Sequence, residues 1–364
     1  MRTSSKVILG GFAGGTLVAG ATAGLVVALA ARRAFRLYKQ WSLGTGFRFP
    51  DADLRGQTVI ITGSSRGLGL ALAEEFARQG CNIVLCARNE EDLTRARQQV
   101  EKLGVEVYAV TCDVSRSEQV DHLISVARKH FGRIDILVNN AGIISVGPLE
   151  SQTLEDFREA MDVMFWGMVQ PTLALLPEMI ERGTGRIVNI TSIGGKISLP
   201  HTLPYNCAKF ATVGFSEGLH AELRRFGIRV LTVVPGLMRT GSYLNAHFKG
   251  DHKGEYSWFA LAGTNPLISI AAERAARRIV DATRRNEAEL VLGWQARSLL
   301  HAHNLSPGLA AEALSVVNLL LPKARKGSTL KQRGRDSESP ITRSALTALG
   351  RRAARRYNQR EEAA

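Results

Sequence analysis

Three residues in the second half of the chain have the types and spacing of a proton-transfer site. Tyr205 and Lys209 are four residues apart, and Ser192 lies thirteen residues before Tyr205. On a helix, Tyr205 and Lys209 share one face. A free phenol has a pKa of about 10, too high for efficient acid/base catalysis at neutral pH. We expect the Lys209 ammonium to lower the pKa of Tyr205 and Ser192 to orient a substrate carbonyl or hydroxyl. A YxxxK pair alone could equally be a surface helix pair, and Ser192 upstream favours catalysis.

A second group of residues has the pattern of a dinucleotide site. The segment TGSSRGLG (62–69) lies between a predicted strand and a predicted helix. Glycines allow a tight turn and a close approach to a pyrophosphate, and the helix N-terminus supplies amide groups. The cofactor-binding candidates in this turn are Gly63, Ser65, Arg66, Gly67, Leu68 and Gly69. Further candidates end later strands: Asp113 and Val114, then Asn140, Ala141 and Gly142. A simple turn, a helix cap and a loop are the structural alternatives.

Alternating strands and helices must hold these residues in place. Short Val/Ile/Leu runs at 58–62, 82–86, 105–110, 135–140, 186–191, 228–234 and 289–293 alternate with amphipathic helical stretches. Such near-continuous apolar strands are typical of a parallel sheet covered on both faces. The pattern therefore predicts an α/β fold, a doubly wound parallel sheet of the Rossmann type in three layers.

With these motifs in order, the chain resembles the short-chain dehydrogenase/reductase family over about residues 55–295. The resemblance rests on TGSSRGLG, CDV (112–114), NNAG (139–142), Ser192, YNCAK (205–209) and PGLMRT (235–240). It implies Tyr205 as general acid/base, with Lys209 lowering its pKa and binding the ribose. It also implies that Pro235, Gly236 and Thr240 contact the nicotinamide end. The implied activity is hydride transfer between nicotinamide and a carbonyl or secondary alcohol.

The charges around the turn favour one cofactor over another. An acidic residue usually ends the second strand in NAD sites of this fold, where it binds the ribose hydroxyls. Here that strand ends in Cys86-Ala87-Arg88-Asn89, without a carboxylate. Arg66 and Arg88 could pair with a 2′-phosphate, or merely face solvent. NADP(H) is therefore favoured over NAD(H).

One position departs from the family pattern. Met164 stands where the family usually has an asparagine that supports a helix bend and a water beside the lysine. Because methionine cannot replace an amide, we expect slowed turnover. This leaves two alternatives to a carbonyl reductase of an apolar, lipid-like substrate. They are an NADP(H)-binding scaffold or sensor with little turnover, and a 3-ketoacyl thioester reductase.

The substrate class is suggested by a segment without clear periodicity, 241–265. Its apolar residues suit an apolar substrate lid, and equally ordinary packing or a membrane-contact patch: Tyr243, Leu244, Phe248, Tyr256, Trp258, Phe259 and Leu261. The chain therefore divides into an anchor with a basic flank (1–40), a reductase domain (41–295), amphipathic helices (296–321) and a disordered basic tail (322–364).

The two ends carry the net charge of +14. Residues 7–31 contain no charge and are long enough to span a membrane, and Arg32, Arg33, Arg36 and Lys39 follow. The positive flank predicts an uncleaved anchor with the catalytic domain in the cytoplasm; a cleaved signal peptide is the alternative.

Four cysteines without CxxC or metal-ligand spacing indicate a reduced compartment and no metal. Expected partners are the membrane and a small apolar carbonyl or alcohol, not nucleic acid; a homo-oligomer remains open.

Overall fold

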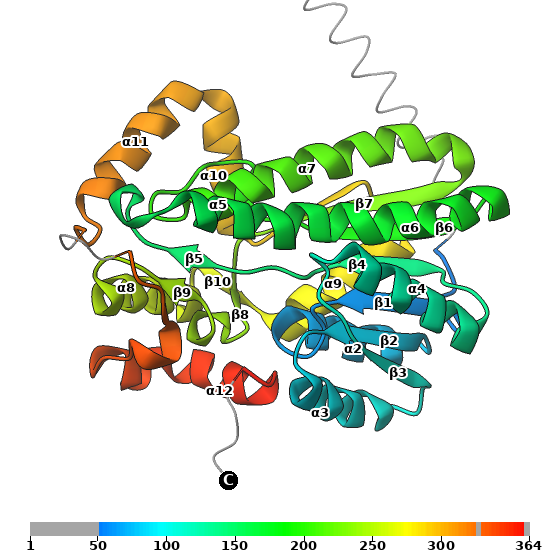
Figure 1. The fold of residues 1–364 in the computed structure, drawn as a ribbon. Coiled ribbons are helices and arrows are strands. Elements are labelled where there is room, and N and C mark those ends of the chain that lie inside the picture. The colour runs from blue at the N-terminus through cyan, green and yellow to red at the C-terminus, as the bar shows by residue number, and fades with distance from the viewer. Residues whose placement is uncertain (1–50, 325–328, 360–364) are drawn as a thin grey trace, which may run out of the picture. The chain divides into compact units, whose positions relative to one another are not determined.

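The computed structural model describes residues 51–324 and 329–359. Its centre is a seven-stranded parallel sheet in the order β3-β2-β1-β4-β6-β7-β11 (Figure 1). The strands are β1 (Thr58–Thr62), β2 (Asn82–Ala87), β3 (Val107–Thr111), β4 (Ile136–Asn139), β6 (Gly185–Ile190), β7 (Ile228–Pro235) and β11 (Glu289–Leu292). All seven runs that the sequence predicts as strands are found in this sheet, so the prediction of a doubly wound α/β fold is confirmed.

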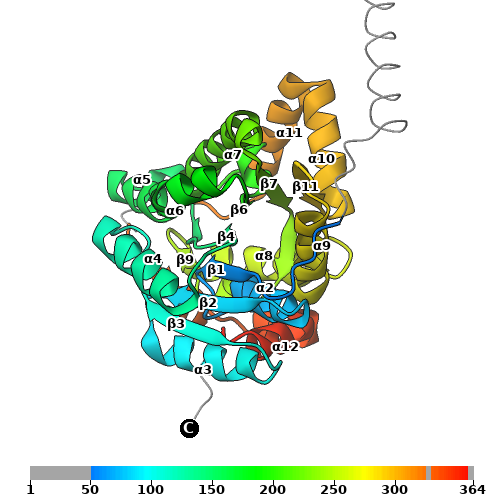
Figure 2. The ribbon, with the colours of Figure 1, turned by 90° about the vertical axis from the view of Figure 1, so that its right-hand side faces the viewer.

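Helices cover both faces of the sheet, as Figure 2 shows along a second direction. One face packs against α2 (Gly67–Arg78), α3 (Glu90–Glu101) and α9 (Ala272–Arg284). The other packs against α4 (Ser117–Phe131), α6 (Gly167–Arg182) and α7 (Leu203–Leu223). Side chains alternate between the two cores along each strand; Ile61 belongs to the first and Ile60 to the second. This two-sided burial explains why the strands are apolar throughout.

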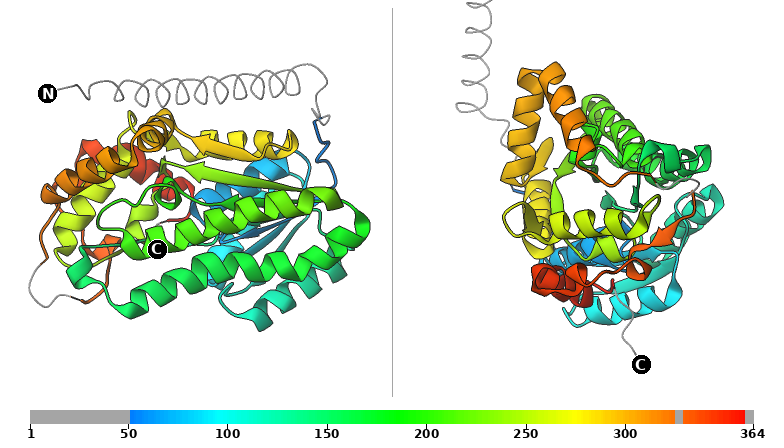
Figure 3. Two further views of the ribbon diagram at one scale, coloured as in Figure 1. Left: turned by 90° about the horizontal axis from the view of Figure 1, so that it is seen from above. Right: turned by 90° about the vertical axis from the view of Figure 1, so that its left-hand side faces the viewer.

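A bent helix precedes β6. It consists of α5 (Leu154–Ala160), a π-helical turn η2 (Met161–Trp166) and α6, and it lies beside α7 (Figure 3). Within the described residues, this Leu154–Arg182 helix has the length and composition of a membrane span. Its residues Leu175 and Met179 are fully buried against the sheet, which identifies a core helix. The predicted anchor (7–31) lies outside the described residues and stays a prediction.

Two helices and a long extension follow the last strand. The helices that the sequence predicts within residues 296–321 are α10 (Trp294–Leu305) and α11 (Pro307–Leu319). No side chain of α11 is buried, and Leu305, Leu309 and Leu319 are among the most exposed apolar residues. Figure 3 shows this helix pair at a distance from α12 (Ala348–Arg356).

The prediction of a disordered tail after residue 322 is wrong for residues 329–359. These form β12 (Gln332–Arg333), the short 3-10 turns η6 (Gly334–Asp336), η7 (Ile341–Arg343) and η8 (Ala345–Thr347), and α12. Strand β12 joins β9 (His247–Phe248) and β5 (Ser145–Val146) in a small sheet. The other short strands, β8 (Leu237–Arg239) and β10 (Ser269–Ala271), pair with each other. We call residues 329–359 the C-terminal strap.

The segment 241–265, for which the sequence shows no clear periodicity, is largely regular structure. It forms the turn η5 (Ser242–Leu244), β9 and helix α8 (His252–Thr264). Tyr243, Leu244, Phe248 and Tyr256 are buried in a cluster of their own, which also contains Ala354 of the strap. Of the alternatives left open by the sequence, ordinary packing is therefore the correct one for these four buried residues. The physical reason is that the strap covers α8.

Candidate active site

The glycine-rich turn is packed too tightly for larger residues. A Cβ atom on Gly69 would lie 2.3 Å from the carbonyl oxygen of Gly63, and one on Gly63 would lie 2.8 Å from Cα of Ala141. Gly67 has a φ of +62°, a conformation that favours glycine. It begins helix α2, so the turn and the N-terminus of the helix line the same space. This is the geometry of a phosphate-binding turn.

The NNAG segment holds this turn from the neighbouring strand. The Asn140 side chain donates to the carbonyl oxygens of Thr62 (2.9 Å) and Gly63 (3.1 Å). The backbone amides of Asn140 and Ala141 donate to the Thr62 hydroxyl at 2.9 and 3.0 Å. The preceding Asn139 is buried and donates instead to Thr172 and Asn189. Asn140 and Ala141 thus stabilise the turn and line the space in front of it.

The second and third strands end beside the turn. Arg66 lies 3.8 Å from Asp92 in the first turn of α3, a carboxylate that the sequence analysis did not single out. Asn89 caps that helix by accepting from the Asp92 amide at 2.7 Å. Arg88 is exposed, and the Asp113 carboxylate accepts from the amide and hydroxyl of Ser115. Two arginines and two carboxylates therefore surround the end of the site farthest from Tyr205.

Ser192, Tyr205 and Lys209 lie together at the other end. Ser192 follows β6 and accepts a hydrogen bond from the Gly194 amide at 3.0 Å. Tyr205 and Lys209 lie on one face of α7, with Nζ of Lys209 5.8 Å from the centre of the Tyr205 ring. Nζ donates to the carbonyl oxygen of Ile190 at 2.9 Å, which fixes the lysine below the tyrosine. The three side chains predicted to carry the chemistry are thus brought together.

The electrostatics of this trio differ from the expectation. Part of the Tyr205 ring is exposed to the cavity, yet burial raises the pKa of its hydroxyl, and a hydrogen bond with Ser192 opposes the shift. Burial also lowers the pKa of Lys209 to about 8. Burial thus opposes the lowering that the sequence predicts for the tyrosine pKa, and it outweighs the hydrogen bond with Ser192. Burial disfavours the charged form of each group, which raises the pKa of a phenol and lowers that of an ammonium.

Met164 lies at the bend that the family's asparagine usually supports. The bend is present as the π-helical turn, and Met164 is buried at 1% exposure. It packs with Ala160 and Ala208 and against Tyr205. Its side chain also approaches Gly142, whose Cβ would lie 3.6 Å from Cγ of Met164. An apolar side chain thus fills the place where an amide would bind water, while the backbone shape is kept.

A cavity of about 460 Å³ connects the two ends. It is lined by every residue that the sequence proposes for catalysis or cofactor binding: Gly63, Ser65, Arg66, Gly67, Leu68, Gly69, Arg88, Asp113, Val114, Asn140, Ala141, Gly142, Ser192, Tyr205, Lys209, Pro235, Gly236 and Thr240. The structure places these residues around one space, and their individual roles stay predictions. In the described part of the chain, no cluster of three or more His, Cys, Asp or Glu could hold a metal.

The cavity also has lining residues that sequence reasoning missed. Arg333, Arg335 and Gln359 come from the strap, and His247 comes from β9. Burial lowers the pKa of His247. The only sequence signal for the strap is its arginine content, which is equally typical of a solvated tail.

Comparisons with known proteins agree with this geometry. A family model described as short chain dehydrogenase matches residues 57–247. The chain is 32% identical over 282 residues to a Drosophila melanogaster protein named dehydrogenase/reductase SDR family protein 7-like, covering 76% of this chain and 85% of that protein. It resembles the structure of L-sorbose reductase from Gluconobacter frateurii complexed with NADPH and L-sorbose, with a TM-score of 0.60 and 31% identity over 66% of this chain and 97% of the other. It also resembles a variant of actinorhodin polyketide ketoreductase with NADPH, with a TM-score of 0.59 and 29% identity over 65% and 95%.

Proposed function

Because the chain belongs to the short-chain dehydrogenase/reductase family, we propose that it is a membrane-anchored, NADP(H)-dependent reductase of an apolar carbonyl compound. Family membership establishes an oxidoreductase acting on carbonyl or alcohol groups. The proposal adds the cofactor, the substrate class and the anchor. The observation that carries it is the single cavity with an arginine-bearing phosphate turn at one end and Ser192, Tyr205 and Lys209 at the other.

The residues present fit a phosphorylated nicotinamide dinucleotide. The close approach of Gly63, Gly69 and Ala141 leaves no room for side chains on these residues of the turn, while the Gln359 side chain of the strap approaches Gly67, whose Cβ would lie 2.6 Å from its amide nitrogen. Arg66 and Arg88 line the adjoining end and would pair with a 2′-phosphate. Asp113 and Val114 would contact the adenine, and Pro235, Gly236 and Thr240 the nicotinamide end. The two neighbouring structures described above contain NADPH, which supports the same choice.

The catalytic residues then divide the reaction between them. Bound NADPH supplies the hydride for the carbonyl carbon. Ser192 orients the carbonyl oxygen by a hydrogen bond, and Tyr205 donates its proton to that oxygen. The raised pKa of Tyr205 keeps the hydroxyl protonated at neutral pH, as a proton donor for reduction must be. Lys209 would bind the cofactor ribose and compensate the phenolate that forms when the proton leaves.

The lining of the catalytic end supports an apolar substrate. Ile143, Ile144, Val163 and Met238 face the same cavity as Tyr205. Such a lining gains free energy by removing apolar surface from water and provides few partners for hydroxyl groups. A compound delivered from a membrane would suit both this lining and the predicted anchor at residues 7–31. The alternative 3-ketoacyl thioester remains a candidate because a polyketide ketoreductase has the same fold.

The proposal is tested with the full-length chain in detergent. NADPH oxidation is followed with ketones, fatty aldehydes, quinones and 3-ketoacyl thioesters. We expect turnover with apolar carbonyl compounds and little with polar sugars of the same size. If NADPH binds tightly while no compound reacts, the scaffold alternative motivated by Met164 is correct. Preferred turnover of carrier-bound thioesters would favour the ketoacyl reductase.

The anchor needs a separate experiment. Full-length protein and a variant lacking residues 1–40 are expressed, and the membrane and soluble fractions are compared after alkaline washing. We expect the full-length chain to stay in the membrane fraction and the shortened chain to become soluble with its NADPH binding intact. Recovery of the full-length chain in the soluble fraction would contradict the anchor.

A further inference from the structure

The C-terminal strap contributes to the cavity wall at both of its ends, through Arg333 and Arg335 and through Gln359. Its strand β12 pairs with β9, so that Arg333 lies opposite His247. The next residue, Gly334, donates from its amide to the carbonyl oxygen of Ala246 at 2.9 Å. A Cβ on Gly334 would lie 1.9 Å from the carbonyl oxygen of Tyr243, so only glycine fits there. The strap begins with a close backbone contact to the segment that borders the cavity.

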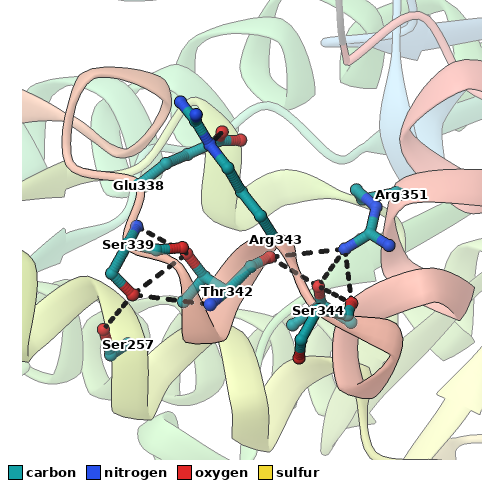
Figure 4. Close-up of polar contacts among 8 residues, drawn as sticks. Ser257, Glu338, Ser339, Thr342, Arg343, Ser344 and Arg351 are labelled. Carbon is teal, nitrogen blue, oxygen red and sulfur yellow. Dashed lines mark hydrogen bonds and ion pairs between the residues drawn. The ribbon is translucent and has the colours of Figure 1, made fainter.

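A polar network then holds the middle of the strap on α8 (Figure 4). Ser339 and Thr342 bond to each other, and the Ser339 hydroxyl lies 3.2 Å from that of Ser257 on α8. Arg351 of α12 donates to the carbonyl oxygen of Ser344 at 2.8 Å, which joins the turns to the last helix. These bonds order a segment whose composition alone suggests a solvated tail.

The end of the strap contacts the glycine-rich turn itself. The Gly67 amide donates to the carbonyl oxygen of Tyr357 at 2.9 Å, and the Asn358 side chain donates to that of Ser65 at 3.3 Å. The Tyr357 side chain is 1% exposed and belongs to the main core cluster. Asn245 donates to both the backbone and side-chain oxygens of Gln359, at 2.9 and 2.7 Å. The strap therefore lies over the turn that would hold the pyrophosphate.

The charges that the strap brings are positive. The described lining of the cavity contains four arginines, two from the sheet domain (Arg66 and Arg88) and two from the strap (Arg333 and Arg335). Its carboxylates are Asp92 and Asp113. Burial lowers the pKa of Arg66, and Arg88, Arg335 and Arg333 add repulsion that Asp92 opposes. Burial lowers the pKa of His247 too, and Lys331, Arg333 and Arg88 add to this shift while Glu159 opposes it. An anion bound between these arginines would reduce their mutual repulsion.

We propose that the C-terminal strap closes over the bound dinucleotide and that Arg333 and Arg335 bind its phosphate groups. The inference rests on the proposed function, because the ligand is the same cofactor. The 2′-phosphate and the pyrophosphate have the same chemistry for a guanidinium, and both lie at this end of the site. The strap would make cofactor affinity depend on residues outside the region shared with the family model, which ends at residue 247.

The test uses the full chain and two variants of equal charge. R333A/R335A removes the two lining arginines, while R352A/R355A removes two exposed arginines of α12 that do not line the cavity. Binding of NADPH and NADH is measured by nucleotide fluorescence at fixed ionic strength. Loss of charge-assisted hydrogen bonds predicts at least about tenfold weaker NADPH binding by R333A/R335A. The control should stay close to the unmodified protein.

The measured affinities for NADPH and NADH distinguish the possible roles of the two arginines. A loss confined to NADPH assigns the arginines to the 2′-phosphate, and an equal loss of NADH assigns them to the pyrophosphate. Unchanged affinity for both nucleotides in R333A/R335A, with NADPH still bound by the unmodified chain, overturns the inference. If the unmodified chain binds neither nucleotide, the proposed function fails instead.

A second measurement needs no substitution. Hydrogen exchange of residues 329–359 is followed with and without NADPH. A strap over the cofactor should exchange more slowly when NADPH is present. Faster exchange would mean that the cofactor displaces the segment, so that the strap is a plug and the inference is wrong.

Discussion

The two ends of the cavity differ in the burial of their charged groups. At the catalytic end, Lys209 is 5% exposed and burial lowers its pKa to about 8, while the pKa of Tyr205 is raised. At the phosphate end, arginines gather around an open space, and Arg66 remains 38% exposed beside Asp92. Burial shifts the pKa values of the groups that would transfer the proton, whereas a guanidinium keeps its charge and can bind a multivalent anion. The comparison teaches that the ammonium at the catalytic end is removed from solvent much further than the guanidinium at the phosphate end.

The largest effect should come from removing the proton donor at the catalytic end. Tyr205→Phe keeps the ring and deletes the hydroxyl that Ser192 contacts. Loss of a positioned acid predicts a fall in kcat of about 10²–10⁴-fold. NADPH affinity should hardly change, because the phosphate end is untouched. A near-normal kcat in this variant would remove Tyr205 from the mechanism.

The next effect tests the phosphate end. Arg66→Ala should weaken NADPH binding by about 10- to 100-fold and leave NADH binding nearly unchanged, because a charged hydrogen bond to phosphate is lost. Arg95→Ala is a matched control, since Arg95 also pairs with Asp92 and has the same 38% exposure, but does not line the cavity. Equal weakening of both nucleotides by Arg66→Ala would argue against recognition of the 2′-phosphate.

A pH profile separates the two ends without any change at the phosphate site. Since the pKa of Lys209 is lowered to about 8, its ammonium is present below that pH and is lost as pH rises through it. Tyr205 stays protonated over this range because its pKa is raised. The value of kcat/KM for NADPH, which reports the free enzyme, should therefore fall by about tenfold per pH unit above 8. Lys209→Arg should have a flat, lower profile between pH 7 and 9, and a flat profile in the unmodified protein would contradict the assignment.

The smallest effect concerns the bend beside Tyr205. Met164→Asn introduces an amide where the family has one and should raise kcat a few-fold by supporting a water beside Lys209. It should also lower Tm, because an imperfectly paired buried amide costs about 1–3 kcal/mol. Met168→Asn buries an amide one turn away and should lower Tm without raising kcat. If kcat does not rise in Met164→Asn, the backbone of the π-helical turn supports catalysis without a side-chain amide at this position.

Much of the sheet and of the site could be predicted because the signals are local. Strand β1 is buried at every residue, so an unbroken TVIIT run identifies it. The glycine turn and the Tyr205–Lys209 pair each lie within eight residues, where backbone geometry links spacing to position. The cap of α3 is equally local, because the Asn89 side chain accepts from the amide of Asp92 three residues later.

The strap could not be predicted because its stabilising contacts are distant in sequence. Gly67 bonds to Tyr357 and Asn245 to Gln359, and no periodic pattern in the tail points to either. Gly334 and Gly350 can approach Tyr243 closely only because they have no side chains. In a sequence, such glycines are more typical of a flexible segment than of a packed one. The upward shift of the Tyr205 pKa could not be predicted either, because burial is a property of the folded chain and not of the YxxxK spacing.

The central claim is that Tyr205 and the arginine end of the cavity act on one bound nucleotide and one carbonyl compound. Its most direct test is a single turnover with NADPH carrying deuterium at the transferable position of the nicotinamide. The account predicts that the label appears on the carbinol carbon of an apolar alcohol product, and that Tyr205→Phe binds the nucleotide without transferring the label. Tight NADPH binding by the unmodified protein, with no label transferred to any carbonyl compound tested, would contradict it.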